Sequence, residues 1–191
     1  TAVCNATGLV APPDGLTFPP ASVDDIPFVC RPIAEGGALH QKGQVEVISS
    51  LEKDGRVIPY DIRMGVFVVF EGETEYIRNC FREYMVRTDP SGRYACLYKR
   101  WHLIGLELGI SVAAVGLRGE PTGAATCFNA DVVATAKRDL KPGEILDGEG
   151  GYTVWGKLFQ SGKSLALGGL PLGLAHHVKL TRAVAKGQSL T

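Results

Sequence analysis

Five side chains suited to acid–base chemistry or charge recognition lie close together near the middle of the chain. They occupy the stretch LYKRWHLIGLE and are Tyr98, Lys99, Arg100, His102 and Glu107. A histidine titrates near neutral pH and can supply the proton that a carbonyl oxygen needs when the carbonyl is reduced. Arginine and lysine bind phosphate or carboxylate oxygens through charge-assisted hydrogen bonds, and helix N-termini favour anions. The residue types therefore favour a site in which His102 moves a proton beside an anion anchor.

The same stretch also has a plain structural interpretation. Alternation along a strand places Lys99 opposite to Tyr98 and Arg100, so half of these side chains would be ordinary surface. On a helix, Glu107 lies about 140° from His102, at the edge of an apolar face. A carboxylate in that position either pairs with a base or serves as a ligand for a metal or a substrate.

Two loops outside this cluster hold further candidates. His40 and Lys42 lie in the Gly-rich stretch GGALHQKGQ, which is typical of a loop that closes over a substrate. The alternative is an exposed loop with an incidental histidine. Asn5 and Thr7 lie in NATG, where a helix C-terminus would turn its polar groups toward a cleft.

The elements that must position these residues are visible as periodic patterns. A Pro-rich segment over residues 11–37 predicts mostly irregular structure. The apolar runs GVFVVF and RYACLYKRW predict strands, the first of them buried, and ETEYIRNCFREYM predicts an amphipathic helix between them. QVEVISSL and RVIPYDIRM predict a β-hairpin, and residues 102–117 predict a mostly buried helix whose glycines, Gly105 and Gly109, face a close neighbour.

Beyond RGEPTG the chain changes character and repeats itself. RDLKPGEIL begins at Arg138 and RAVAKGQSL begins at Arg182, and the two align with Glu144 opposite Gln188. Each copy follows a strand-like run and contains a glycine that tolerates a positive φ. The repeat predicts a small all-β unit with approximate internal symmetry.

Composition excludes several classes of partner. Twenty basic and twenty acidic side chains cancel, so we expect no nucleic-acid partner and no membrane partner. Five scattered cysteines form no C-x-x-C pair, which favours a reducing, cytoplasmic location over a disulfide framework. No apolar run approaches the roughly 18 residues that span a bilayer.

Several stretches together resemble one protein family. ATAKRDLKPGEIL resembles the opening of SAF domains, which are β-clip modules, and GLPLGLAHHVKLTRAVAKGQSLT resembles their closing half. NATGL, LYKRWHLIGLELGISVAAVGLRGEPTG and DVVATAKRDLKPGE are similar to homoserine-dehydrogenase-like oxidoreductases that carry a C-terminal SAF domain. That family includes reductoisomerase-like enzymes of isoprenoid biosynthesis, which convert 1-deoxy-D-xylulose 5-phosphate to methylerythritol 4-phosphate.

The resemblance implies an α+β fold in two parts. Residues 1–125 would be a catalytic and dimerisation region with a mixed sheet and packed helices, and residues 126–191 would be an all-β SAF domain. The substrate would be a small hydroxy or keto compound, homoserine-like or a sugar phosphate, and the enzyme a homodimer. Tyr98, His102 and Glu107 would be catalytic. The substrate would be bound by Lys99 and Arg100, with Asn5, Thr7, His40 and Lys42.

The resemblance also implies a cofactor, NADP or NAD, and leaves a divalent metal open. The chain lacks the G-x-G-x-x-G turn, since GEGGYT over residues 148–153 has Thr in place of the last glycine. TAVCNATG reads like the middle of a fold, so we expect a fragment that is inactive without an N-terminal Rossmann domain. The alternative is a SAF-type module that binds a carbohydrate or another small molecule with no redox role. Such a module needs only about the last sixty-five residues, which leaves the first part unexplained.

Overall fold

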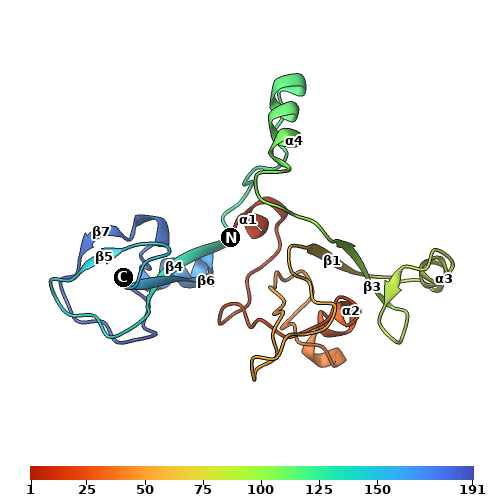
Figure 1. The fold of residues 1–191 in the computed structure, drawn as a ribbon, viewed down its shortest axis with the longest axis horizontal. Helices are drawn as coiled ribbons and strands as arrows, with labels where there is room; N and C mark the ends of the chain where they lie inside the picture. Colours follow the sequence, from red (N-terminus) through yellow and green to blue (C-terminus); the bar gives the residue numbers. More distant parts are fainter. The chain divides into compact units, whose positions relative to one another are not determined.

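The computed structural model describes all residues from 1 to 191 and divides them into two compact units (Figure 1). The central unit comprises Thr17–Lys42 and Glu46–Gly123, and the terminal unit comprises Thr1–Leu16, Gly43–Val45 and Ala124–Thr191. Both units combine short helices with small sheets, which is compatible with the expected α+β class. The expected domain boundary between residues 125 and 126 stays a prediction.

The central unit is built on one three-stranded antiparallel sheet. Its strands are β1 (Val66–Glu71), β2 (Arg87–Thr88) and β3 (Tyr94–Lys99), in the order β1-β3-β2. The strands expected from GVFVVF and RYACLYKRW are thus confirmed as β1 and β3. The short helices α2 (Ile26–Val29) and η1 (Ile33–Glu35) interrupt the otherwise irregular segment that precedes the sheet.

Helix α3 (Glu75–Glu83) confirms the amphipathic pattern between the strands. The hydroxyl of Thr74 caps its start by accepting a hydrogen bond from the Ile77 amide at 3.3 Å. Only Phe81 is buried on this helix, and its ring meets that of Phe70 edge to face with 5.4 Å between centroids. That contact fixes α3 against β1.

One face of the sheet covers the core of the central unit. Phe67, Val69 and Tyr98 pack against a buried cluster, whereas the opposite face leaves Val66 and Val68 exposed. The expectation of a buried strand β1 therefore holds for one face only. The buried cluster consists of Ala21, Val23, Ile26, Cys30, Leu39, Ile48, Ile62 and Cys96.

The β-hairpin expected between residues 44 and 64 does not form regular strands. The two runs pair with each other only at the Leu51–Val57 β-bridge, around a turn that the Gly55 amide closes onto the Glu52 carbonyl at 2.9 Å. Pro59 lacks an amide hydrogen and interrupts the ladder in the second run. The turn was predicted correctly and the strands were not.

The apolar segment over residues 102–117 is a shorter and more exposed helix than its sequence predicts. α4 spans Leu108–Ala113 and continues as η2, Ala114–Arg118, which is π-helical. Gly105 has a φ of 89°, and this left-handed backbone prevents the helix from starting at residue 102. Only one residue of α4 and η2 is buried, and a Cβ added at Gly105 or Gly109 would meet no atom within 4 Å. The prediction of a buried helix with a close neighbour at its glycines is wrong within this chain.

The terminal unit contains two antiparallel strand pairs, β4 with β6 and β5 with β7. It also contains helix α5, which the sequence patterns did not predict, so this unit is not purely β. No helix anywhere in the chain is long and apolar enough to cross a membrane. The elements are α1 (Ala2–Thr7), β4 (Ala130–Ala136), β5 (Ile145–Asp147), β6 (Val154–Gln160), α5 (Ser161–Leu167), η3 (Leu172–Leu174) and β7 (His176–Lys179).

The sequence repeat becomes an approximate two-fold relation within the terminal unit. Its two copies exchange backbone hydrogen bonds in matched pairs, so that each bond has a counterpart with the copies swapped. The internal symmetry predicted from the repeat is therefore confirmed. The pairs are Leu140 N to Val184 O (2.8 Å) with Val184 N to Leu140 O (3.0 Å), Gly143 N to Leu180 O with Gly187 N to Ala136 O (both 2.8 Å), and Leu180 N to Glu144 O (2.8 Å) with Ala136 N to Gln188 O (2.9 Å).

Candidate functional site

The strongest candidate site follows the end of β3, where three of the predicted side chains meet. The Glu107 carboxylate accepts hydrogen bonds from the Lys99 ammonium group and lies 2.8 Å from His102 Nδ1. The backbone amide of His102 donates to the Met64 carbonyl at 2.6 Å, which ties this turn to the residues just before β1. The fold thus brings Lys99, His102 and Glu107 together although the predicted helix does not connect them.

The electrostatics of this group suit proton transfer. The Lys99 ammonium group first, and the bond from His102 second, hold the pKa of Glu107 below its usual range. The ionised carboxylate orients the imidazole through Nδ1, which leaves Nε2 without a protein partner. Because 54 % of the His102 side chain is exposed, Nε2 is open to a substrate. The arrangement is an oriented acid–base group.

Tyr98 and Arg100 do not join this group. Tyr98 is half-buried against the core cluster, and its ring lies so close to Gly65 that an added Cβ would approach it to 2.3 Å. It therefore occupies the opposite face of β3 from Lys99, as strand alternation requires. The guanidinium of Arg100 lies 4.8 Å from the centre of the Trp101 ring, a cation–π contact at the exposed end of the strand.

Lys42 belongs to a second charged group, which we call the ionic cluster: Glu35, Lys42, Glu71, Arg93 and Tyr94. Arg93 and Lys42 both bond Glu71. Glu35 accepts from Arg93 at 3.0 Å and from the Tyr94 hydroxyl at 2.8 Å, and it lies 3.7 Å from the Lys42 ammonium group. The bond from Lys42 is the main cause that lowers the pKa of Glu71. The cluster thus ties the loop that contains Lys42 to the sheet.

The ionic cluster was missed by sequence reasoning except for Lys42. A usable signal existed, because antiparallel pairing of the two predicted strands places Glu71 opposite Tyr94. No sequence signal points to Glu35. Tyr94 and Lys99 lie at opposite ends of β3, about 16 Å apart along the strand, so the cluster and the His102 group are separate sites. His40 is exposed in the same loop as Lys42.

Asn5 and Thr7 lie in the terminal unit, where their polar groups hold the backbone. The Asn5 side-chain oxygen accepts from the amides of Asn129 and Ala130 at 2.8 and 2.9 Å, and its amide group donates to the Ala130 carbonyl at 3.1 Å. The Thr7 hydroxyl donates to the Val3 carbonyl at 2.6 Å, one turn back along α1. Both side chains have structural work in this chain.

The GEGGYT turn does not fit the pyrophosphate of a dinucleotide cofactor. In GEGGYT the amides of Tyr152 and Thr153 donate to the Asp147 carboxylate, at 2.6 and 3.0 Å, so they are not available for a pyrophosphate. The turn also connects β5 to another strand, β6, whereas a cofactor-binding turn opens a helix. No three His, Cys, Asp or Glu side chains gather as metal ligands.

Comparison with known proteins adds one finding that bears on chemistry. The family model described as the catalytic domain of oxidoreductase DRL matches residues 1–108, which is more than half of the chain. That range contains the His102 group and the ionic cluster. No curated protein matches the chain.

Proposed function

The chain belongs to the oxidoreductase DRL family, and we propose that it is the catalytic and C-terminal part of an NAD(P)-dependent enzyme. The substrate in this proposal is a small hydroxy or keto compound, homoserine-like or 1-deoxy-D-xylulose 5-phosphate-like. The observation that carries the proposal is the bond from His102 Nδ1 to an ionised Glu107, which leaves Nε2 exposed. The family match covers residues outside the last third, which argues against a free-standing SAF binding module with no redox role.

In this proposal His102 exchanges a proton with the oxygen atom of the substrate. A carbonyl that is reduced to an alcohol gains a proton on oxygen, and an alcohol that is oxidised gives one up. Glu107 keeps the imidazole oriented through its contact with Nδ1. Tyr98 is the remaining predicted catalytic residue, and in this proposal it supports the site from its packed position against the core.

The substrate anion would be held beside this group. Arg100 contacts only the Trp101 ring, so its N–H groups remain available for phosphate or carboxylate oxygens. Lys99 adds positive charge but shares it with Glu107. Contacts of the substrate with Asn5, Thr7, His40 and Lys42 remain predictions.

The cofactor in this proposal, NADP or NAD, is held mainly by a domain that precedes these residues in a longer protein. The occupied amides of the GEGGYT turn support that assignment. In this proposal any divalent metal would take ligands from outside this chain as well, because no three His, Cys, Asp or Glu side chains gather in it. All five cysteines are unpaired thiols, which supports a cytoplasmic location. The repeat symmetry supports a SAF domain over residues 126–191.

We also propose that the enzyme is a homodimer that covers the apolar segment after His102. Residues 108–117 carry no charge, and a helix that is apolar all round requires burial on several sides. Sedimentation velocity tests this proposal, with a dimer expected for the wild type and a monomer for Ile110→Asp. A monomeric wild type at micromolar concentration would contradict it. The exposed apolar side chains are Ile104, Leu106, Leu108, Ile110, Val112, Val115 and Leu117.

The proton-transfer role is tested by His102→Gln in the enzyme assayed with its cofactor and either candidate substrate. Glutamine can still bond Glu107 but does not titrate, so kcat should fall by roughly 10²- to 10⁴-fold with KM little changed. His176→Gln, at an exposed histidine of β7 outside the matched range, is the control, and we expect it to keep kcat within about threefold of the wild type. An unchanged kcat for His102→Gln would remove His102 from the chemistry.

A further inference from the structure

The two copies of the repeat differ in charge at several aligned positions, and one of these is Glu144, which has Gln188 as its counterpart. In the first copy Arg138 donates to the Glu144 carboxylate at 2.7 Å, and the same carboxylate accepts the Lys141 amide at 2.7 Å. The second copy has Gln188 where the first has Glu144, and its side-chain oxygen accepts the Ala185 amide at 3.3 Å. The turn-holding bond is therefore kept in both copies, whereas the negative charge is present in only one.

Arg182, the counterpart of Arg138, is consequently a cation without a carboxylate partner. Its guanidinium donates to the hydroxyl of Thr191 and to no acidic group. Lys179, on β7 nearby in sequence, also makes no ion pair. The second copy thus carries positive charge that the first copy neutralises internally, and an arginine with free N–H groups is suited to bind an anion bidentately.

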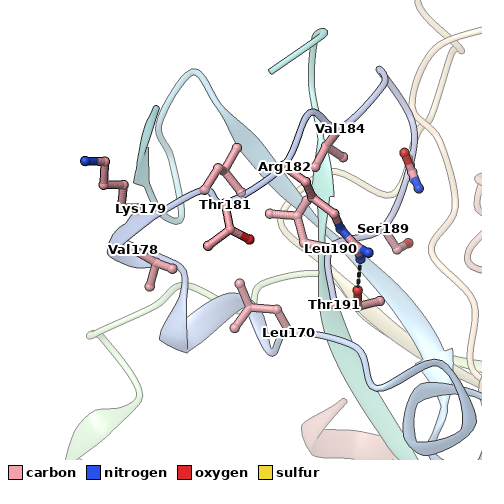
Figure 2. A pocket seen from close by; sticks show the side chains of 11 residues that line it. Leu170, Val178, Lys179, Thr181, Arg182, Val184, Ser189, Leu190 and Thr191 are labelled. Carbon is pink, nitrogen blue, oxygen red and sulfur yellow. Dashed lines mark hydrogen bonds between the residues drawn. The ribbon is translucent and has the colours of Figure 1, made fainter. Parts of the chain in front are cut away.

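Arg182 and Lys179 border a cavity of about 240 Å³ in the terminal unit (Figure 2). Leu170, Val184 and Leu190 give it an apolar floor that is continuous with the buried core of this unit. The side chains of Arg182 and Thr191 lie at one side, joined by their hydrogen bond, as Figure 2 shows. An apolar floor beside a few polar groups and a free cation is typical of small-molecule sites.

We propose that this cavity binds a small organic acid. The carboxylate of the ligand bonds the Arg182 guanidinium, and its short aliphatic body lies over Leu170, Val184 and Leu190. The volume equals that of roughly eight water molecules, which suits an acid of about six carbons. The proposal does not depend on the oxidoreductase reaction, because every residue it uses lies in the terminal unit outside residues 1–108.

The test uses hexanoate as the probe, titrated into the full 191-residue chain while amide signals of residues 178–191 are followed by NMR. We expect saturable shifts for hexanoate and at least about tenfold weaker binding of hexanamide, the neutral isostere, because a charged hydrogen bond is lost. Inorganic phosphate, which cannot use the apolar floor, should also bind more weakly than hexanoate.

Three variants locate the binding. Arg182→Gln should weaken hexanoate binding about tenfold or more. Gln188→Glu should weaken it similarly, because it rebuilds the ion pair of the first copy while keeping the bond to the Ala185 amide. Arg138→Gln is the matched control and should leave the affinity unchanged. Equal binding of hexanamide, no saturable binding at all, or an affinity indifferent to both Arg182→Gln and Gln188→Glu would overturn the proposal.

Discussion

The two ends of β3 carry similar side chains that are used in opposite ways. In the ionic cluster, Lys42 and Arg93 are shared between Glu35 and Glu71, so every charge has a protein partner. At the other end the carboxylate binds two basic groups but leaves one titratable nitrogen exposed to solvent. The comparison teaches that a group of charges paired entirely with one another, as in the ionic cluster, stabilises structure. A group that leaves one ring nitrogen exposed, as His102 does, can exchange a proton with a substrate.

The largest expected effect tests the end of β3 at Tyr94, to which we assign a structural role. Asp89, whose side chain is fully buried, accepts hydrogen bonds from Arg31, from Ser91 and from the amides of Arg93 and Tyr94. Asp89→Ala leaves the largely buried Arg31 guanidinium unpaired and should cost about 3–5 kcal/mol of unfolding free energy, measured by urea denaturation.

Asp54→Ala is the matched control for this substitution. Asp54 also bonds an arginine, Arg56, but both of those side chains are exposed. We therefore expect no measurable loss of stability for Asp54→Ala. Equal losses for Asp54→Ala and Asp89→Ala would contradict the assignment of this end of the strand to structure.

The next largest effect tests the end of β3 at Lys99, where His102 and Glu107 meet. Glu107→Gln preserves the shape of the side chain but removes the charge that orients His102 and binds Lys99. A charge-assisted bond is stronger than a neutral one by about 1.4 kcal/mol, so kcat should fall about tenfold with KM little changed. Glu71→Gln in the ionic cluster should leave kcat unchanged. A larger kcat loss for Glu71→Gln than for Glu107→Gln would reverse the roles of the two ends.

The sequence predicted the elements whose signal is local. Strands β1 and β3 and helix α3 follow from apolar periodicity, and the Thr74 cap agrees with the start of α3. The repeat symmetry followed from two short matching stretches. The prediction of a hairpin at residues 44–64 was wrong because Pro59 cannot donate a ladder hydrogen bond, although the residues around it follow a strand pattern. The prediction of a buried helix after His102 was wrong because its apolar composition was taken as evidence that this chain itself buries it.

The candidate site could be predicted only in part, for a geometric reason. Lys99, His102 and Glu107 are close in sequence, so a single turn is enough to bring them together. Glu35 reaches Arg93 across 58 positions, a contact that depends on how the irregular first third folds back on the sheet. Pro- and Gly-rich segments carry no periodic signal from which such a contact can be inferred.

The smallest expected effect concerns acid stability at the structural end. Lys42 and Arg93 lower the pKa of Glu71 below its ordinary value of about 4.5. A lowered folded-state pKa means that Glu71 stabilises the fold above pH 4.5 and that this contribution disappears as the pH falls through the lower folded value. Because the ion pairs are partly exposed, Glu71→Gln should cost less than about 1 kcal/mol at pH 7 and reduce the loss of stability between pH 5 and about pH 3.

Urea midpoints at pH 5 and about pH 3 measure the effect, with Glu83→Gln, a substitution at a residue that makes no ion pair, as the control. A steeper acid loss in Glu71→Gln than in the wild type would show that the ionic cluster does not stabilise the fold through this carboxylate.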